Sequence, residues 1–140
     1  MNAAHKPLLV IGVAIALLAA ISLRNNGSSA PELVPWRDDY TAAKAEAIAA
    51  NKPLLVYFTA SWCDPCKSMK RTTWNDESVK AAMEPYVPVK VDVDTNRDLA
   101  DRFRIQSVPN FYIIDGTGKA VKHTEGAMRA TEMVAWLRRS

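Results

Sequence analysis

Cysteine and histidine are scarce in this chain of 140 residues, and their scarcity limits the chemistry available to it. The only cysteines are Cys63 and Cys66, and the only histidines are His5 and His123. A structural zinc site takes four ligands, usually cysteine or histidine, and the sequence holds no second cysteine pair to complete one. We therefore expect no metal site. Zinc shared between two chains is an alternative that no further residue supports.

A large excess of charge of either sign is also missing, because the net charge is only +3. Two of the 18 Lys and Arg residues, Lys6 and Arg24, flank an apolar N-terminal run, and the 15 Asp and Glu residues nearly balance the rest. No basic field exists for nucleic acid, so no nucleic-acid partner is expected. No flavin or nicotinamide fingerprint occurs, so we expect no cofactor beyond a redox-active disulfide.

Residues 7–23 form an apolar run of 17 residues without a charge. Such a run is short for a membrane-spanning helix and slightly long for the core of a signal peptide. It is apolar on every face and lies at the terminus, which disfavours a buried core helix. Ser28-Ser29-Ala30 would suit a signal peptidase, but Pro31 directly follows. We favour a retained N-terminal transmembrane helix, with cleavage as the alternative.

The composition divides the chain into three parts. Residues 1–24 are the expected signal anchor. Residues 25–35 begin with NNGSSAP, which is polar and rich in turn formers and is typical of a linker. Residues 36–140 are enough for one globular domain.

Hydrophobic periodicity and turn residues predict helices and strands in the order α-β-α-β-α-β-β-α. Asp38 and Asp39 can cap the first helix, in which Tyr40, Ala43, Ala47 and Ile48 have helical spacing. The expected helices span 38–50, 63–83, 95–103 and 130–138, and the expected strands span 54–58, 87–93, 110–114 and 119–124.

This order predicts an α/β domain with a mixed central sheet. The first two strands are joined by a helical crossover and should be parallel, whereas the last two form an antiparallel hairpin. Cys63 then lies just past the carboxyl end of a central strand, where α/β proteins place their sites.

The stretch SWCDPCK, from Ser61 to Lys67, holds both cysteines. A disulfide across so short a loop removes little chain entropy, so a structural staple is a weak alternative. Redox chemistry needs an activated thiolate beside a second thiol, and a helix N-terminus favours the thiolate. We expect Cys63 to be an exposed nucleophile and Cys66 to be the more buried resolving thiol. Pro65 fits an early helix position, where its missing N–H costs little.

At these residues the sequence resembles the thioredoxin-fold family. Trp62 to Lys67, WCDPCK, is close to the thioredoxin pattern WCxPCK. Val108-Pro109, just before an expected strand, resembles the family's cis-proline, and Gly126 resembles the glycine before the last helix. The resemblance covers most of residues 36–138. It implies a thioredoxin fold with helices on both faces of the sheet, and a groove where the Val108-Pro109 backbone pairs with a substrate peptide.

A subgroup is suggested by further similarities. Trp36, the segment Asn51-Lys52-Pro53 and residues 72–83 (TTWNDESVKAAM) are similar to the periplasmic C-terminal domains of transmembrane thiol:disulfide interchange reductases. They also resemble small membrane-tethered thioredoxin-like proteins of bacteria. Both groups work outside the cytoplasmic membrane and mostly deliver electrons.

Two positions depart from the family pattern. Thioredoxins usually carry a buried Asp six residues before the nucleophilic cysteine, and that position here is Tyr57. Lys90, which resembles the lysine neighbour of that Asp, is retained, so Tyr57, Lys90 or a water would have to handle the proton. Asn110 follows Pro109 where Thr is common, and its side chain is expected to bond near the groove or to the local backbone.

Residues beside the cysteines bear on the direction of electron flow. A carboxylate at Asp64 should disfavour the Cys63 thiolate, whereas the helix dipole and Lys67 favour it. No histidine stands between the cysteines, unlike in the family's strong oxidants. We therefore expect a reductant, with a potential nearer ~−270 mV than ~−120 mV. Trp62 is expected to shield the site.

The expected function is that of a membrane-tethered reductase of disulfides in exported proteins. A thiol oxidase or disulfide isomerase on the same fold is one alternative, and a peptide-binding module without turnover is another. The resemblance implies disulfide-containing protein substrates and a membrane electron donor. We expect a monomer, anchored once in the bacterial inner membrane with its domain in the periplasm, or cleaved and secreted there in the alternative.

Overall fold

A computed structural model describes residues 32–139 of the chain. The expected anchor, and the linker as far as Pro31, lie outside the described residues. No helix between residues 32 and 139 is long and apolar enough to cross a membrane.

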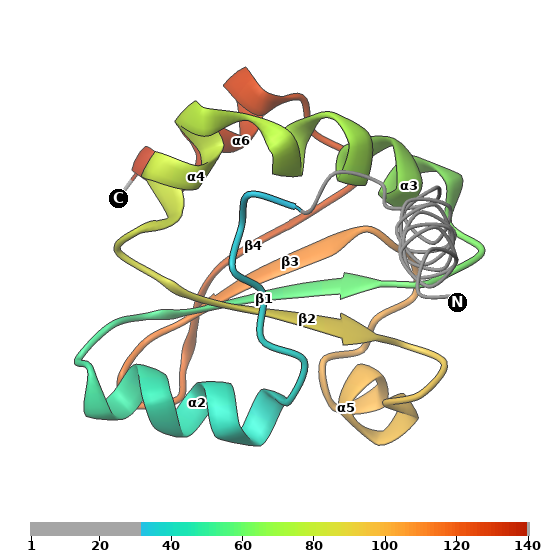
Figure 1. The fold of residues 1–140 in the computed structure, drawn as a ribbon. Helices are drawn as coiled ribbons and strands as arrows, with labels where there is room; N and C mark the ends of the chain where they lie inside the picture. The colour runs from blue at the N-terminus through green and yellow to red at the C-terminus, as the bar shows by residue number, and fades with distance from the viewer. Residues whose placement is uncertain (1–31, 140) are drawn as a thin grey trace, which may run out of the picture. The chain divides into compact units, whose positions relative to one another are not determined.

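The described residues form a mixed four-stranded sheet between two layers of helices, as expected (Figure 1). The strand order is β2-β1-β3-β4, with β1 parallel to β2, and β3 antiparallel to both β1 and β4. The strands are β1 (Leu54–Thr59), β2 (Val87–Asp92), β3 (Asn110–Ile114) and β4 (Ala120–Glu125). β1 is central and almost fully buried, because helices cover both of its faces.

Helices α2 (Tyr40–Ala49) and α5 (Arg97–Arg102) cover one face of the sheet (Figure 1). The Asp39 carboxylate caps α2 by accepting the N–H of Ala42 at 2.8 Å, which confirms the expected start. The helix ends at Ala49 with Ala50 as its C-cap, and Asn51, the next residue, takes a positive φ of 51°. Ala43 and Ala47 are buried as expected, but Ile48 is 55% exposed and does not contribute to the core.

The single helix expected over 63–83 is wrong, because three short segments occupy this stretch. They are α3 (Asp64–Arg71), a 3-10 turn η1 (Thr73–Asn75) and α4 (Glu77–Met83). Thr72 leaves the helical conformation (φ −120°, ψ −75°), and its hydroxyl bonds back to the Ser68 carbonyl. Asp76 then starts a new helix, because its carboxylate accepts the N–H groups of Ser78 and Val79.

Together with α6 (Ala130–Arg138), α3 and α4 cover the second face of the sheet (Figure 1). The expected bounds of α6 and β3 are confirmed. The core on this face, here called the site-side core, includes Tyr57, Trp74, Phe111 and Met133, as well as both cysteines. The core on the α2 side is built around Val56, Phe58 and Val89.

The N-terminal part of the described chain runs along the free edge of β2. Arg37 pairs with Val89, and the Lys90 N–H donates to the Arg37 carbonyl at 2.8 Å. Val34 is buried, and the Trp36 ring packs 5.0 Å from that of Trp74. Residues 32–35, assigned from sequence to the linker, are therefore packed onto the domain.

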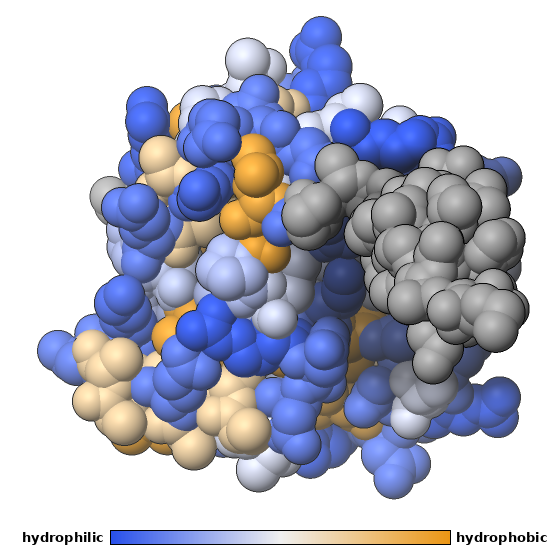
Figure 2. Space-filling view, in the orientation of Figure 1, coloured by the Kyte–Doolittle hydropathy of each residue, from blue (hydrophilic) through white to orange (hydrophobic). Residues whose placement is uncertain are grey.

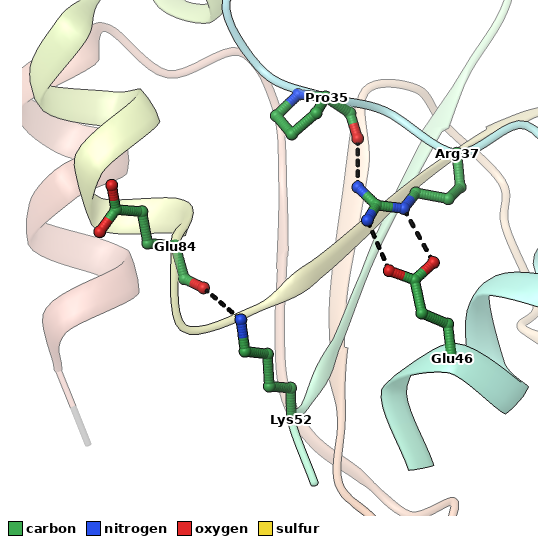
Figure 3. A network of polar contacts seen from close by, with 5 residues as sticks. All are labelled: Pro35, Arg37, Glu46, Lys52 and Glu84. Carbon is green, nitrogen blue, oxygen red and sulfur yellow. Dashed lines mark hydrogen bonds and ion pairs between the residues drawn. The ribbon is translucent and has the colours of Figure 1, made fainter. Parts of the chain in front are cut away.

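Polar contacts tie this segment to the α2 layer (Figure 3). The Arg37 guanidinium binds both carboxylate oxygens of Glu46, at 2.5 and 3.0 Å, and also donates to the Pro35 carbonyl. Lys52, after α2, donates to the Glu84 carbonyl at the end of α4. The face shown in Figure 2 is largely hydrophilic, in keeping with this polar network.

Candidate active site

Cys63 and Cys66 lie at the N-terminus of α3 and are joined by a disulfide. β1 ends at Thr59, and the short link after it brings Cys63 to the N-cap of α3, where its Sγ accepts the Cys66 N–H at 3.2 Å. Pro65 stands in the first turn, as expected. The free N–H groups of this turn would stabilise a thiolate on Cys63.

The expected difference in burial between the two cysteines is wrong. Cys63 is 3% exposed and Cys66 is 4% exposed, because the disulfide lies inside the site-side core instead of on the surface. The two cysteines differ in their surroundings instead. Cys63 Sγ lies 3.6 Å from the Val108 carbonyl oxygen, whereas Cys66 lines a cavity.

The loop before β3 brings Val108 and Pro109 to the disulfide. Their peptide bond is cis, and Pro109 is buried. The Pro109 carbonyl accepts the N–H of Gly126, whose φ of 92° favours glycine. The buried Asn110 amide bonds through Oδ1 to His123 Nε2 at 2.8 Å and donates to the Ser107 carbonyl. Asn110 therefore stabilises this loop, and its bond to the Ser107 carbonyl is the local backbone bond that was expected.

Trp62 is 63% exposed beside the disulfide, and its indole N–H donates to Asp94 Oδ2 at 2.9 Å. Asp92 and Asp94 both lie at the turn where β2 ends. Asp92 does accept the N–H groups of Asp94 and Thr95, but the side chain of Asp94 holds Trp62. Parallel strands end at one edge of the sheet, so the position of Asp94 just after β2 was the signal for this contact.

Asp64 and Lys67 form an exposed ion pair on α3, with Lys67 Nζ 3.3 Å from Asp64 Oδ1. The Asp64 side chain is 88% exposed. Water and Lys67 therefore screen the Asp64 carboxylate, which weakens both of the opposing effects on Cys63 expected from the sequence.

A cavity of about 360 Å³ opens behind Cys66. Both candidates for proton handling, Tyr57 and Lys90, line it. Tyr57 is 2% exposed and stacks on Phe111, and burial raises the pKa of its phenol. Lys90 Nζ lies 3.3 Å from each carboxylate oxygen of Glu32, another residue of the cavity wall that the sequence did not single out.

Metal ligands do not gather in the described part of the chain. Residues 32–139 contain no group of three His, Cys, Asp or Glu side chains that could hold a metal ion.

Comparison with known proteins places this geometry in a family. Residues 40–140 match the family model of the thioredoxin-like domain. Thioredoxin of Alicyclobacillus acidocaldarius is 33% identical over 92 residues, which cover 66% of this chain and 85% of that protein. The thiol:disulfide interchange protein DsbD of Ralstonia nicotianae is 34% identical over 99 residues. That match covers 67% of this chain but only 16% of the longer relative.

Among solved structures, the oxidised C-terminal domain of DsbD from Neisseria meningitidis superposes with a TM-score of 0.59 at 26% identity. The superposition covers 72% of this chain and 95% of that domain. The chain therefore belongs to the thioredoxin-like family and is a thiol–disulfide oxidoreductase whose CxxC pair is Cys63 and Cys66.

Proposed function

We propose that this protein is a membrane-tethered reductase of disulfides in exported proteins. The observation that carries the proposal is the Cys63–Cys66 disulfide at the N-terminus of α3, with the Val108 carbonyl oxygen beside Cys63 Sγ. The resemblance to DsbD, a thiol:disulfide interchange protein, supports disulfide exchange on proteins.

The proposed reaction moves two electrons from the reduced chain to a substrate disulfide. The Cys63 thiolate attacks one substrate sulfur, forms a mixed disulfide and releases the other sulfur as a thiolate. Cys66 loses its proton and attacks Cys63 Sγ, which forms the Cys63–Cys66 disulfide and releases the second substrate thiolate. Both substrate thiolates take protons from solvent. A partner dithiol must then reduce the Cys63–Cys66 disulfide again.

Distinct roles follow for the residues around the disulfide. Cys63 is the attacking thiolate because its sulfur is the N-cap of α3. Val108 and Pro109 present backbone to an extended substrate segment, which would pair with it as an added strand. Trp62, held by Asp94, borders this groove, and Pro65 shapes the first turn of α3.

The charges near Cys63 support this direction of electron flow. A strong oxidant needs a strongly stabilised thiolate, and the only cation on the first turn of α3, Lys67, is paired with Asp64. The α3 N-terminus alone then stabilises the thiolate moderately. We propose that the protein gives electrons for this reason.

The tether is the apolar run of residues 7–23. We propose that residues 1–24 anchor the chain in a bacterial inner membrane, that residues 25–31 connect it, and that residues 32–140, which include the packed segment 32–35, act in the periplasm as a monomer. A membrane protein with its own dithiol would supply the electrons, because re-reduction is needed in an oxidising compartment.

The equilibrium potential of the Cys63–Cys66 pair tests the direction. We expect the full chain in detergent, equilibrated with dithiothreitol or glutathione buffers, to give a value at or below about −240 mV. Alkylation of free thiols followed by mass measurement reads the reduced fraction. A potential above about −180 mV would instead make the protein an oxidase or isomerase.

Cysteine variants test the order of attack. Cys66→Ser should accumulate a mixed disulfide with a substrate such as insulin, because nothing resolves it, whereas Cys63→Ser should form none. Non-reducing electrophoresis separates these species. Retention of insulin by Cys63→Ser with wild-type affinity would point to a binding module and would falsify turnover as the function.

A further inference from the structure

The resolving step of the proposed function requires a group that takes the proton from Cys66, and the following inference rests on that proposed step. Cys66 is only 4% exposed, and a thiol is a poor nucleophile until it is deprotonated. The acceptor must therefore reach Cys66 through the cavity that its side chain lines.

The walls of this cavity hold few groups that could accept a proton. The side chains of Lys67, Lys70 and Lys90 are hydrogen-bond donors and offer no acceptor. Tyr57 is a buried phenol whose pKa is raised by that burial, so it stays neutral and is no base near neutral pH. Only two carboxylates, Glu32 and Asp92, are left.

Asp92 is already committed to the turn that follows β2. Its Oδ1 accepts the Asp94 N–H at 2.8 Å and the Thr95 N–H at 3.4 Å, which holds the loop before α5. Protonation of Asp92 would weaken the hydrogen bonds of that turn.

Among residues 32–139, Glu32 has no such backbone role, and Lys90 is the partner that holds its carboxylate. Its side chain is 11% exposed, whereas the other four paired carboxylates in the described part of the chain are at least 44% exposed. Lys90 Nζ lies 3.3 Å from both carboxylate oxygens of Glu32. Burying an unpaired carboxylate would be costly, and this ion pair offsets that cost in the partly buried position of Glu32.

The cavity also suits a water bridge between Glu32 and Cys66. Its volume of about 360 Å³ exceeds that of several water molecules. The Trp74 indole N–H is buried in its wall without a well-formed hydrogen bond among the described residues, although the Tyr57 hydroxyl lies near it, so a water there could pair with the Trp74 N–H.

We infer that Glu32, positioned by Lys90, accepts the proton of Cys66 through cavity water during resolution of the mixed disulfide. The proton leaves Cys66 Sγ for the Glu32 carboxylate as Cys66 Sγ bonds to Cys63 Sγ, and the bond from Cys63 to the substrate sulfur breaks. The departing sulfur keeps the electron pair of that bond. Glu32 afterwards returns the proton to solvent, and no further reactant is consumed.

A two-phase reaction separates this step from the first attack. The reduced full chain in detergent is mixed with less than one equivalent of dithiobis(nitrobenzoate), an aromatic disulfide that releases a coloured thiolate. Attack by Cys63 releases one coloured thiolate, and resolution by Cys66 releases the second. We expect Glu32→Gln to leave the rate of the first phase unchanged and to slow the second phase at pH 7 by at least about tenfold. Full general acid–base catalysis contributes about 10²–10⁴-fold, and the effect here should be smaller because solvent can also accept the proton.

Matched variants and a pH series distinguish proton transfer from a structural effect. Glu32→Asp should recover most of the second-phase rate, and Asp92→Asn should change it less than about twofold. In Glu32→Gln the second phase should rise with pH over a wider range than in the wild type, as hydroxide replaces the carboxylate. Lys67, Lys70, Lys90, Asp92 and Tyr57 are the same in both proteins, so the difference reports Glu32.

Each outcome bears on one idea. The role of Glu32 is overturned if the second phase has the same rate in the wild type and in Glu32→Gln. It is also overturned if Asp92→Asn slows the second phase as much as Glu32→Gln does. A wild-type protein that shows no first phase contradicts the proposed function itself. Far-UV circular dichroism, with an intact first phase, confirms that the variant is folded.

Discussion

Thr73 is a buried polar side chain that joins two segments far apart in the sequence. It is 1% exposed, and its hydroxyl donates to the Met128 carbonyl at 2.7 Å. This bond ties η1, just after α3, to the loop before α6. A buried hydrogen bond contributes modestly when made, but losing one partner leaves the other unsatisfied.

Thr73→Val keeps the shape of the side chain and removes the donor. We expect the free energy of unfolding to fall by about 1–3 kcal/mol, because the Met128 carbonyl is left without its partner. Urea unfolding of the oxidised protein measures the change. Thr131→Val, at an exposed position on α6, is the control and should stay within about 0.5 kcal/mol of wild type. Equal losses in both variants would count against a specific role for the hydroxyl.

At the scale of elements, a break separates α3, the helix that begins beside Cys63, from α4. Thr72 ends α3, and Asp76 starts α4 by capping it with its carboxylate. Hydrogen bonds lower the pKa of Asp76. The largest effect comes from the Ser78 hydroxyl, and the N–H groups of Ser78 and Val79 add to it. Hydrogen bonds to the charged form of a carboxyl favour that form.

A lowered pKa in the folded state makes the cap a source of pH-dependent stability. Its contribution is complete above the ordinary carboxyl pKa of 3.8 and is lost as the pH falls through the lower, folded value. Asp76→Asn keeps a capping group without the charge. We therefore expect the wild type to be more stable than Asp76→Asn at pH 7, with the gap narrowing below pH 3.8. Thermal unfolding against pH measures it, and a gap that widens in acid would contradict the assignment.

At the scale of the whole molecule, the sheet separates two cores, and only one of them contains the disulfide. Met133 is 0% exposed in the site-side core. Ile48 lies on α2 on the other side and is 55% exposed. Helical spacing alone treats the two as equivalent, since both lie on apolar stretches of a helix.

Substitution by alanine should separate these two residues. Met133→Ala should lower the free energy of unfolding by about 2–5 kcal/mol, because it leaves a cavity in a packed core. Ile48→Ala should change it by no more than about 0.5 kcal/mol, because the side chain is already in water. Denaturant unfolding at a fixed redox state compares them, and a large loss in Ile48→Ala would mean that this face of α2 is covered in the functional protein.

Local patterns explain why much of the fold could be predicted. The apolar runs of β1, β2 and β3 and the Asp39 cap depend on near neighbours in the chain. The crossover between β1 and β2 determines that they are parallel. The cysteine spacing and Pro109 likewise marked the candidate site. The break at Thr72 was not predicted. A threonine that bonds back to the preceding turn and a new N-cap residue are only weak sequence signals against a continuous helix.

The sequence by itself determined the element order, the mixed sheet, the redox pair at the start of α3 and the loop that meets it. Only the tertiary structure decided the contacts between segments that are distant along the chain. Trp62 reaches Asp94 across 32 positions, and Lys90 reaches Glu32 across 58. Burial of Cys63 inside the site-side core is a result of the same kind. Periodicity and capping act over a few residues, whereas these contacts form only once β1, β2 and the segment along β2 lie side by side, so periodicity and capping do not record them.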